Sequence, residues 1–256
     1  MYYYIFEPIK NRYDRAFQER LKRTINTLGI AGETVVPTPA RTIDELVEIG
    51  LTKGYSTIVG AGSDLFANKL MTALLSFKQE DDQRIVFGFV PSDPQNSSIA
   101  KIIKVSNIQE ACETLRYRKI ETTSVGLIYP KKYFISPINL FSKKPIKISL
   151  SLHNLEAICE VTQVTITHEI LISWHNDQLS PSPFKKFIFS LFDKEIKDNY
   201  FTKFSCQKMI LQSSPSLPVY LENEIITHTP LEIKRIENRL HLIVGRDIIL
   251  SSWKEN

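Results

Sequence analysis

Two short polar segments combine residue types that can bind phosphate groups, and each directly follows an apolar run. The first is residues 60–64 (GAGSD). Glycines let a backbone approach a phosphate closely, the Ser63 hydroxyl can donate a hydrogen bond, and Asp64 can hold Mg²⁺ or cap a helix. The segment therefore predicts either a phosphate-binding turn, with Gly60 and Gly62 as its glycines, or an ordinary tight turn.

The second polar segment is residues 91–98 (PSDPQNSS), in which Ser92, Asp93 and Asn96 offer side-chain donors and acceptors. Ligands of parallel α/β sheets bind beyond the carboxyl ends of the strands, so we expect the two segments to lie close together. An ordinary Pro/Ser/Asn turn would have the same composition. Neither segment matches a P-loop or a complete dinucleotide-binding fingerprint. Their joint placement favours phosphate binding over two unrelated turns.

The first half of the chain alternates strands with helices. Helical apolar spacing separates strand-like runs at 2–6, 33–36, 55–59, 84–90 and 123–129. Thr42 with Glu45, and Asn107 with Glu110, have the spacing of capping boxes at helix starts. This alternation predicts an α/β domain over residues 1–130, with a parallel sheet and helices on both faces.

The second half alternates apolar and polar residues with the period of two that is typical of strands. Ile146, Ile148 and Leu150 show the pattern, which predicts an antiparallel β domain over residues 131–256. Around a polar Glu237-Asn238 pair, the alternation predicts a hairpin. The fold class is therefore α/β plus β, and the C-terminal residues can return to the first domain.

Composition narrows the class of protein. The 256 residues carry a net charge of +4 in mixed sequence, so binding to nucleic acid is not required. The three cysteines have no CxxC pair, which predicts reduced thiols and no zinc site. No apolar run is long enough to span a bilayer. We expect a cytoplasmic protein. Peripheral membrane contact stays an open alternative, and so does a homodimer formed through a strand edge. Segment 131–147, rich in lysines and aromatics, is either a headgroup-contacting surface or a solvated linker.

The order of these features resembles the diacylglycerol kinase catalytic family, which includes bacterial lipid kinases and sphingosine kinases and is more distantly related to NAD kinases. Residues 59–65 (VGAGSDL) stand in the place of that family's GGDGT loop, and residues 90–101 (VPSDPQNSSIAK) in the place of its P-x-G-T-x-N-D-x-A segment. Residues 217–244 resemble its C-terminal segment, with LENE in place of a D-G-E turn. The resemblance covers nearly the whole chain, and it implies that the antiparallel β domain over residues 131–256 is a β-sandwich.

The resemblance implies ATP- and Mg²⁺-dependent transfer of a phosphoryl group to the hydroxyl of a lipid substrate at a membrane surface. It makes Gly60 and Gly62 phosphate-loop glycines and matches Asn96 and Ala100 to the second motif. Glu222 replaces the C-terminal aspartate. The resemblance thus implies catalytic carboxylates at Asp64 and Glu222, and nucleotide contacts at Gly60, Gly62, Ser63, Ser92, Asp93 and Asn96.

Several motif positions differ from the family pattern. An ungapped alignment puts Gly62 at the GGDGT aspartate, whereas a shift of two puts Asp64 there and Asn68 at a family asparagine, so both registers stay open. Asp93-Pro94 replaces Gly-Thr in the second motif, and Ser97 replaces its aspartate. These changes leave open a diverged lipid kinase or an inactive nucleotide- or lipid-binding protein that keeps the scaffold. NAD kinase-like activity is a third hypothesis, which is disfavoured because the end of the β domain resembles the lipid-kinase branch.

Overall fold

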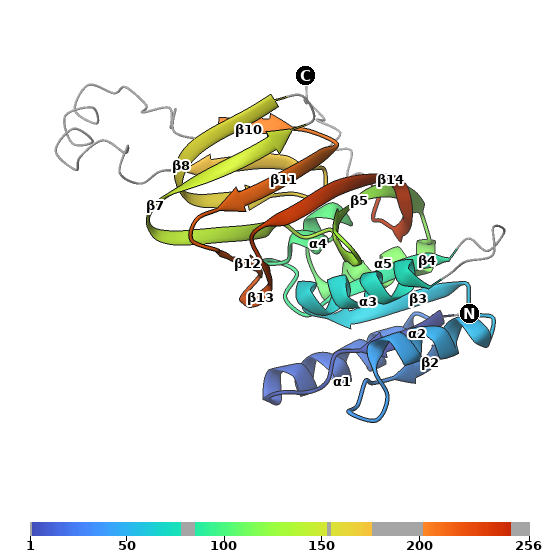
Figure 1. Ribbon diagram of the computed structural model, residues 1–256. Coiled ribbons are helices and arrows are strands. Elements are labelled where there is room, and N and C mark those ends of the chain that lie inside the picture. The colour runs from blue at the N-terminus through green and yellow to red at the C-terminus, as the bar shows by residue number, and fades with distance from the viewer. Residues whose placement is uncertain (1, 78–84, 153–154, 176–201, 247–256) are drawn as a thin grey trace, which may run out of the picture. The chain divides into compact units, whose positions relative to one another are not determined.

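The computed structural model describes residues 2–77, 85–152, 155–175 and 202–246 (Figure 1). The chain divides into two compact units. The first unit comprises Met1–Thr123 and Asn238–Asn256, and the second comprises Ser124–Glu237. This division lies earlier in the chain than the predicted boundary at residue 130.

The first unit is a parallel sheet with helices. Its strands are ordered β2, β1, β3, β4, and the last residues of β14 (Leu231–Ile243) pair in parallel with β4. The strands are β1 (Tyr2–Phe6), β2 (Gly32–Val35), β3 (Thr57–Gly62) and β4 (Val86–Pro91). The helices are α1 (Arg12–Thr27), α2 (Ile43–Thr52), α3 (Asp64–Ser76), α4 (Ser98–Ile102) and α5 (Ile108–Tyr117). The predicted α/β fold class is confirmed.

Alternation along β1 explains why helices cover both faces of this sheet. The Tyr2 hydroxyl donates to the carbonyl of Leu115 in α5 (2.6 Å). The Tyr3 ring points the other way, where a Cβ on Gly50 of α2 would lie only 2.7 Å from its Cδ1. Successive side chains of a strand face opposite sides of the sheet, so one run of tyrosines serves both layers. In the same unit, α1 packs against α5 and α2 against α3.

Side-chain caps set the helix starts. Thr42 and Glu45 form the predicted reciprocal box at the start of α2. At α5 the prediction is half right: Asn107 Oδ1 accepts from the Glu110 amide (2.9 Å), but the Glu110 carboxylate accepts from the amide and hydroxyl of Ser106. The group that donates to the Glu110 carboxylate therefore belongs to Ser106, one residue before the N-cap Asn107.

The second unit is antiparallel, as predicted. Its main path runs β10 (Thr202–Ser205), β9 (Leu171–His175), β8 (Leu155–Ile166), β7 (Ile138–Leu152), β11 (Lys208–Ser213) and the first residues of β14. β12 (Pro218–Leu221) pairs with β7 and with β13 (Glu224–His228), and the end of β5 (Ile120–Ile128) pairs with β6 (Lys132–Phe134).

The predicted hairpin at Glu237-Asn238 is wrong. β14 is one continuous strand from Leu231 to Ile243. Its start pairs antiparallel with β11 in the second unit, and its end pairs in parallel with β4 in the first. The polar residues between these paired parts are exposed, and Asn238 has φ +50°. An exposed stretch inside a long strand thus has the sequence pattern of a turn.

Segment 131–147 is not a linker, because it forms β6 and the first part of β7. Its exposed side chains include Phe141, Lys143 and Lys144, and Phe141 is 47% exposed. None of the helices that the structure describes is long and apolar enough to cross a membrane.

Gly60 lies inside β3, not in the turn that follows it. A Cβ there would lie 2.7 Å from Leu70 Cδ1 of α3 and 3.2 Å from Phe89 Cδ2. We expect Gly60→Ala to lower the free energy of unfolding by about 1–3 kcal/mol through overpacking, measured by urea denaturation. Leu70→Val shortens the obstructing side chain, so it should lower the free energy of unfolding less in the Gly60→Ala variant than in the wild type. Strictly additive effects would contradict this packing role.

Candidate functional site

The candidate site lies where three neighbouring parallel strands end. β3 runs between β1 and β4, with Phe6 opposite Ala61 and Gly62 opposite Pro91. The residues that follow the three strands are therefore brought to the same edge of the sheet. We call this the carboxyl-edge site; its members are Glu7, Gly62, Ser63, Asp64, Ser92 and Ser97.

Gly62 forms the turn at the end of β3. Its carbonyl accepts a hydrogen bond from the Ser92 amide (2.8 Å), which ties the two predicted polar segments together. A Cβ at this position would lie 2.5 Å from Glu7 Oε2 and 2.6 Å from Glu7 Cβ. Its φ of +157° is also one that L side chains rarely adopt. Gly62 is thus the glycine of this turn, and its absent side chain is what lets Glu7 approach.

Ser63 connects the turn to α3. Its hydroxyl accepts a hydrogen bond from the Phe66 amide (3.3 Å), as an N-cap does. Its own backbone amide donates to Glu7 Oε2 at 2.7 Å. The amide that a phosphate would use at this turn therefore already binds a carboxylate.

Glu7 is the residue that sequence reasoning missed. Its side chain is 18% exposed, Oε1 accepts from Lys10 Nζ (2.9 Å), and its backbone amide donates to the Ala61 carbonyl (2.8 Å). Burial alone would raise the pKa of Glu7, but hydrogen bonds from Ser63 and Lys10 outweigh it and hold the pKa below the usual 4.5. A sequence signal existed, since Glu7 directly follows the buried strand that pairs with β3.

The Asp64 side chain connects the two polar segments by hydrogen bonds. Its side chain is buried, at 4% exposure for the residue. Oδ2 accepts from the amides of Ser98 (2.6 Å) and Ile99 (3.1 Å), and Oδ1 accepts from the Ser97 hydroxyl. The Ser97 hydroxyl in turn accepts from the Ala100 amide (2.8 Å). Of the two roles considered for Asp64, capping is observed, but the helix capped is α4 and not its own.

The second polar segment is held by short-range bonds. Asn96 Nδ2 donates to Asp93 Oδ2 (2.7 Å), and the Ser97 amide donates to the Asp93 carbonyl (3.1 Å). Ser92, Asp93 and Asn96 are all exposed. Their predicted contacts with a nucleotide stay predictions.

Two further sequence candidates have different surroundings. Asn68 is buried and donates from Nδ2 to the Asp64 carbonyl (2.7 Å), one turn back in α3. Glu222 belongs to the second unit, where it forms the exposed turn between β12 and β13 with φ +52°. Its catalytic role stays a prediction.

A magnesium site does not emerge from protein ligands alone. Within the described ranges, no group of three or more His, Cys, Asp or Glu side chains is placed to hold a metal. The Asp64 carboxylate already accepts hydrogen bonds from Ser97, Ser98 and Ile99.

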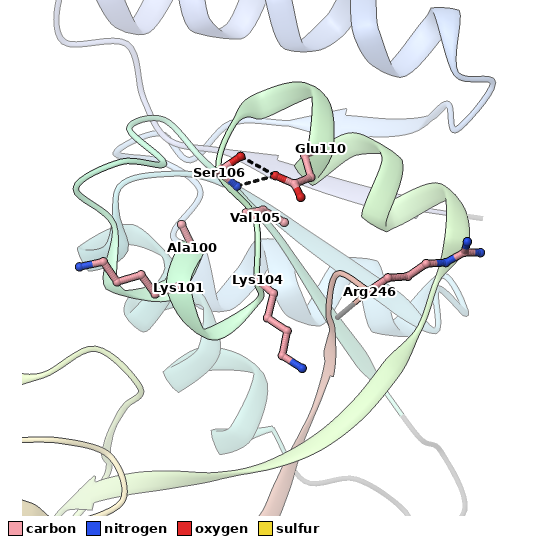
Figure 2. A pocket seen from close by; sticks show the side chains of 7 residues that line it. All are labelled: Ala100, Lys101, Lys104, Val105, Ser106, Glu110 and Arg246. Carbon is pink, nitrogen blue, oxygen red and sulfur yellow. Dashed lines mark hydrogen bonds between the residues drawn. The ribbon is translucent and has the colours of Figure 1, made fainter. Parts of the chain in front are cut away.

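A concavity of about 380 Å³ in the first unit, separate from the carboxyl-edge site, lies beside the end of α4 and the start of α5. It is lined by Ala100, Lys101, Lys104, Val105, Ser106, Glu110 and Arg246. Figure 2 shows that the heads of Lys101, Lys104 and Arg246 diverge, and that Glu110 turns back to bind Ser106. These cations do not converge on a single point, so the concavity lacks the geometry of an anion site.

Comparison with solved structures finds the same fold over almost the whole chain. A Bacillus anthracis strain Sterne protein provisionally designated a diacylglycerol kinase has a TM-score of 0.76 at 11% identity, covering 97% of this chain and 98% of that one. A structure described as a diacylglycerol kinase from the same strain has a TM-score of 0.73 at 10% identity, covering 97% and 98%. Yeast NADH kinase complexed with NADH has a TM-score of 0.51 at 8% identity, covering 97% and 84%.

The chain therefore has the fold of diacylglycerol kinases, which is related to that of NAD kinases. No protein-family model matches the sequence, and no curated protein matches it. At such low identities the likeness establishes the fold, and the chemistry has to be argued from the site.

The Asp64 contacts generate a stability prediction. Asp64→Ala leaves the buried Ser97 and Ile99 donors and the half-buried Ser98 amide without their acceptor, so we expect it to lower the free energy of unfolding by about 3 kcal/mol. Ser97→Ala removes the α4 cap and should cost about 1–2 kcal/mol. Urea denaturation measures both. Asp44→Ala, at an exposed position in the first turn of α2, is the matched control and should cost less than about 1 kcal/mol. Equal losses for Asp64 and Asp44 would refute the capping role.

The lowered pKa of Glu7 generates a pH prediction. Its folded-state pKa lies below the usual 4.5, so the charged form stabilises the fold at neutral pH. That stabilisation should be complete above 4.5 and disappear as the pH falls through the lowered pKa. We therefore expect the stability difference between wild type and Glu7→Gln to be constant above 4.5 and to shrink below it, in urea titrations at stepped pH. A difference that grows on acidification would have the wrong sign.

Proposed function

We propose that the protein is a diverged ATP-dependent lipid kinase that transfers the γ-phosphoryl group of ATP to a lipid hydroxyl. The observation that supports this most directly is the fold shared with diacylglycerol kinases over 97% of the chain. The carboxyl-edge site adds support, because ligands of parallel α/β sheets bind beyond strand ends. The Gly62 turn and the segment after β4 meet at that edge.

Phosphoryl transfer makes a limited chemical demand on the protein. The bond between the γ-phosphorus and the bridging oxygen breaks, a bond to the lipid hydroxyl oxygen forms, ADP leaves, and the hydroxyl proton needs an acceptor. Positioning and charge stabilisation account for most of the catalysis. Mg²⁺ entering with the nucleotide would supply neutralisation of phosphate charge.

Each role would fall to a named residue. Ser63, Ser92 and Asn96 would contact phosphates, with Gly62 providing the close approach. Glu222 would accept the hydroxyl proton. Asp64 would serve the nucleotide site by anchoring α4 and the segment before it, since its oxygens cap that helix.

The lipid substrate places the reaction at a membrane surface. A cytoplasmic protein with peripheral contact would meet it there, and the exposed Phe141, Lys143 and Lys144 of β7 have the composition of a headgroup-contacting surface. A homodimer is compatible with this function but is not needed for it.

A second candidate is a member of the same fold that binds a nucleotide or lipid without turnover. It is favoured by one specific observation: the Ser63 amide and the Asp64 carboxylate, two groups expected to serve the nucleotide, are bonded to protein partners. Such a protein would keep the scaffold and lose the reaction.

The test is a lipid-kinase assay with Mg²⁺, γ-labelled ATP and mixed micelles of diacylglycerol, monoacylglycerol or sphingosine. We expect labelled lipid from the wild type and a loss of at least about 100-fold in Glu222→Gln, because that change removes the proton acceptor. Glu156→Gln, at an exposed position of β8 in the same unit, is the matched control and should keep full activity.

The possible outcomes separate the candidates. Labelled lipid that Glu222→Gln abolishes would establish the kinase, whereas undiminished labelling by that variant would remove Glu222 from the reaction. ATP binding without labelled lipid would support the binding protein. Absence of both would refute the kinase and the nucleotide-binding form of the second candidate.

A further inference from the structure

The Glu7 carboxylate occupies the place at which the glycine turn would receive a phosphate. Ser63 N–H is the backbone donor at the junction of the turn and α3, and it binds Glu7 Oε2 at 2.7 Å. Gly62 leaves the space that a side chain would fill, and Glu7 fills it: a Cβ at Gly62 would lie 2.6 Å from Glu7 Cβ. The donor and the space at this turn, which would suit an anion, are therefore already occupied by the Glu7 carboxylate.

A phosphate and Glu7 compete for the Ser63 amide, because Glu7 Oε2 already accepts its hydrogen bond at 2.7 Å. The cavity beside Glu7, lined by residues of α1 together with Gly62 and Ser92, does not include Ser63 and measures about 10 Å³. That is about the space of a single water molecule. A phosphate group could reach the Ser63 amide only if the Glu7 side chain left it.

Glu7 can leave without unfolding the sheet edge. The Glu7 backbone is fixed by its amide bond to the Ala61 carbonyl, so only the side chain has to rotate. Its side chain is 18% exposed, and the Lys10 side chain that holds Oε1 is 67% exposed. When a phosphate replaces the carboxylate, the ammonium of Lys10 lies close enough to interact with it.

We propose that Glu7 is a built-in anion that competes with nucleotide phosphates for the glycine turn and thereby sets the affinity of the turn for them. This inference rests on the proposed function only in taking the turn as the phosphate subsite. It concerns which ligands enter, and it holds whether or not phosphoryl transfer follows.

Glu7 can compete with a phosphate in two ways, and a substitution that keeps the shape of the side chain tests the contribution of its charge. Carboxylate and phosphate need the same N–H, and their negative charges repel one another. Glu7→Gln keeps the size of the side chain and an oxygen for Ser63 N–H but removes the charge. We expect this variant to bind ATP and inorganic tripolyphosphate at least about tenfold more tightly than wild type, while adenosine, which has no phosphate, binds unchanged.

The experiment is calorimetric titration of wild type, Glu7→Gln and Glu48→Gln with ATP, inorganic tripolyphosphate and adenosine at constant ionic strength. Glu48 is exposed on α2, so its substitution matches the change in net charge away from the turn. Thermal unfolding checks that each variant is folded. Binding to the Glu48→Gln protein should equal that of the wild type.

A measurement on the wild type alone keeps the test independent of the variants. In a tripolyphosphate titration followed by NMR, the resonances of the Ser63 amide and of the Glu7 carboxylate carbon should shift together, because the phosphate replaces the carboxylate on that amide. Tight tripolyphosphate binding that shifts Ser63 while leaving Glu7 unchanged would overturn the proposal.

The variant outcomes are equally decisive. No gain in tripolyphosphate affinity for Glu7→Gln, or the same gain for Glu48→Gln, would overturn the inference even if the wild type proves to be a lipid kinase. A gain confined to Glu7→Gln, in a protein that labels no lipid, would uphold the inference and leave the proposed reaction refuted.

Discussion

The buried Asp64 carboxylate is the constraint around which the candidate site is built. A charged group at 4% exposure is costly unless donors meet it, and here Ser97, Ser98 and Ile99 all donate to it. Because Asp64 begins α3 and the donors begin α4, one side chain fixes the geometry between two strand ends. At the same edge the Ser92 amide donates to the Gly62 carbonyl, a second link between the two segments.

The chemistry around this scaffold differs from that expected of a phosphate loop. Glu7 provides an internal anion, and Asp64 faces a protein helix instead of an open ligand position. The fold nevertheless matches diacylglycerol kinases at a TM-score of 0.76 with only 11% identity. Packing positions such as Gly60 keep a sheet and helix in place through shape alone, whereas a phosphate site needs particular donors. The scaffold can therefore persist while the ligand preference changes.

Local patterns predicted much of the fold and little of the site. The strand at Tyr2–Phe6 and the Thr42 box involve neighbours in sequence, so their signals are complete within a few residues. The Glu237-Asn238 pattern failed because exposure inside a long strand and exposure in a turn select the same residues. Glu7 and Ser63 are 56 residues apart, and Asp64 and Ser97 are 33 apart, so their pairing follows from sheet register and not from spacing.

The continuity of β14 has a consequence for how the chain assembles. The strand that pairs with β4 lies beyond the second unit in sequence, so during synthesis β4 is made long before its partner. Until then the first unit presents an open strand edge with Val86 and Phe87 on it, a surface on which other chains can pair. The nascent protein should thus pass through a stage at which its aggregation tendency is highest, and chaperone demand should peak before β14 emerges from the ribosome.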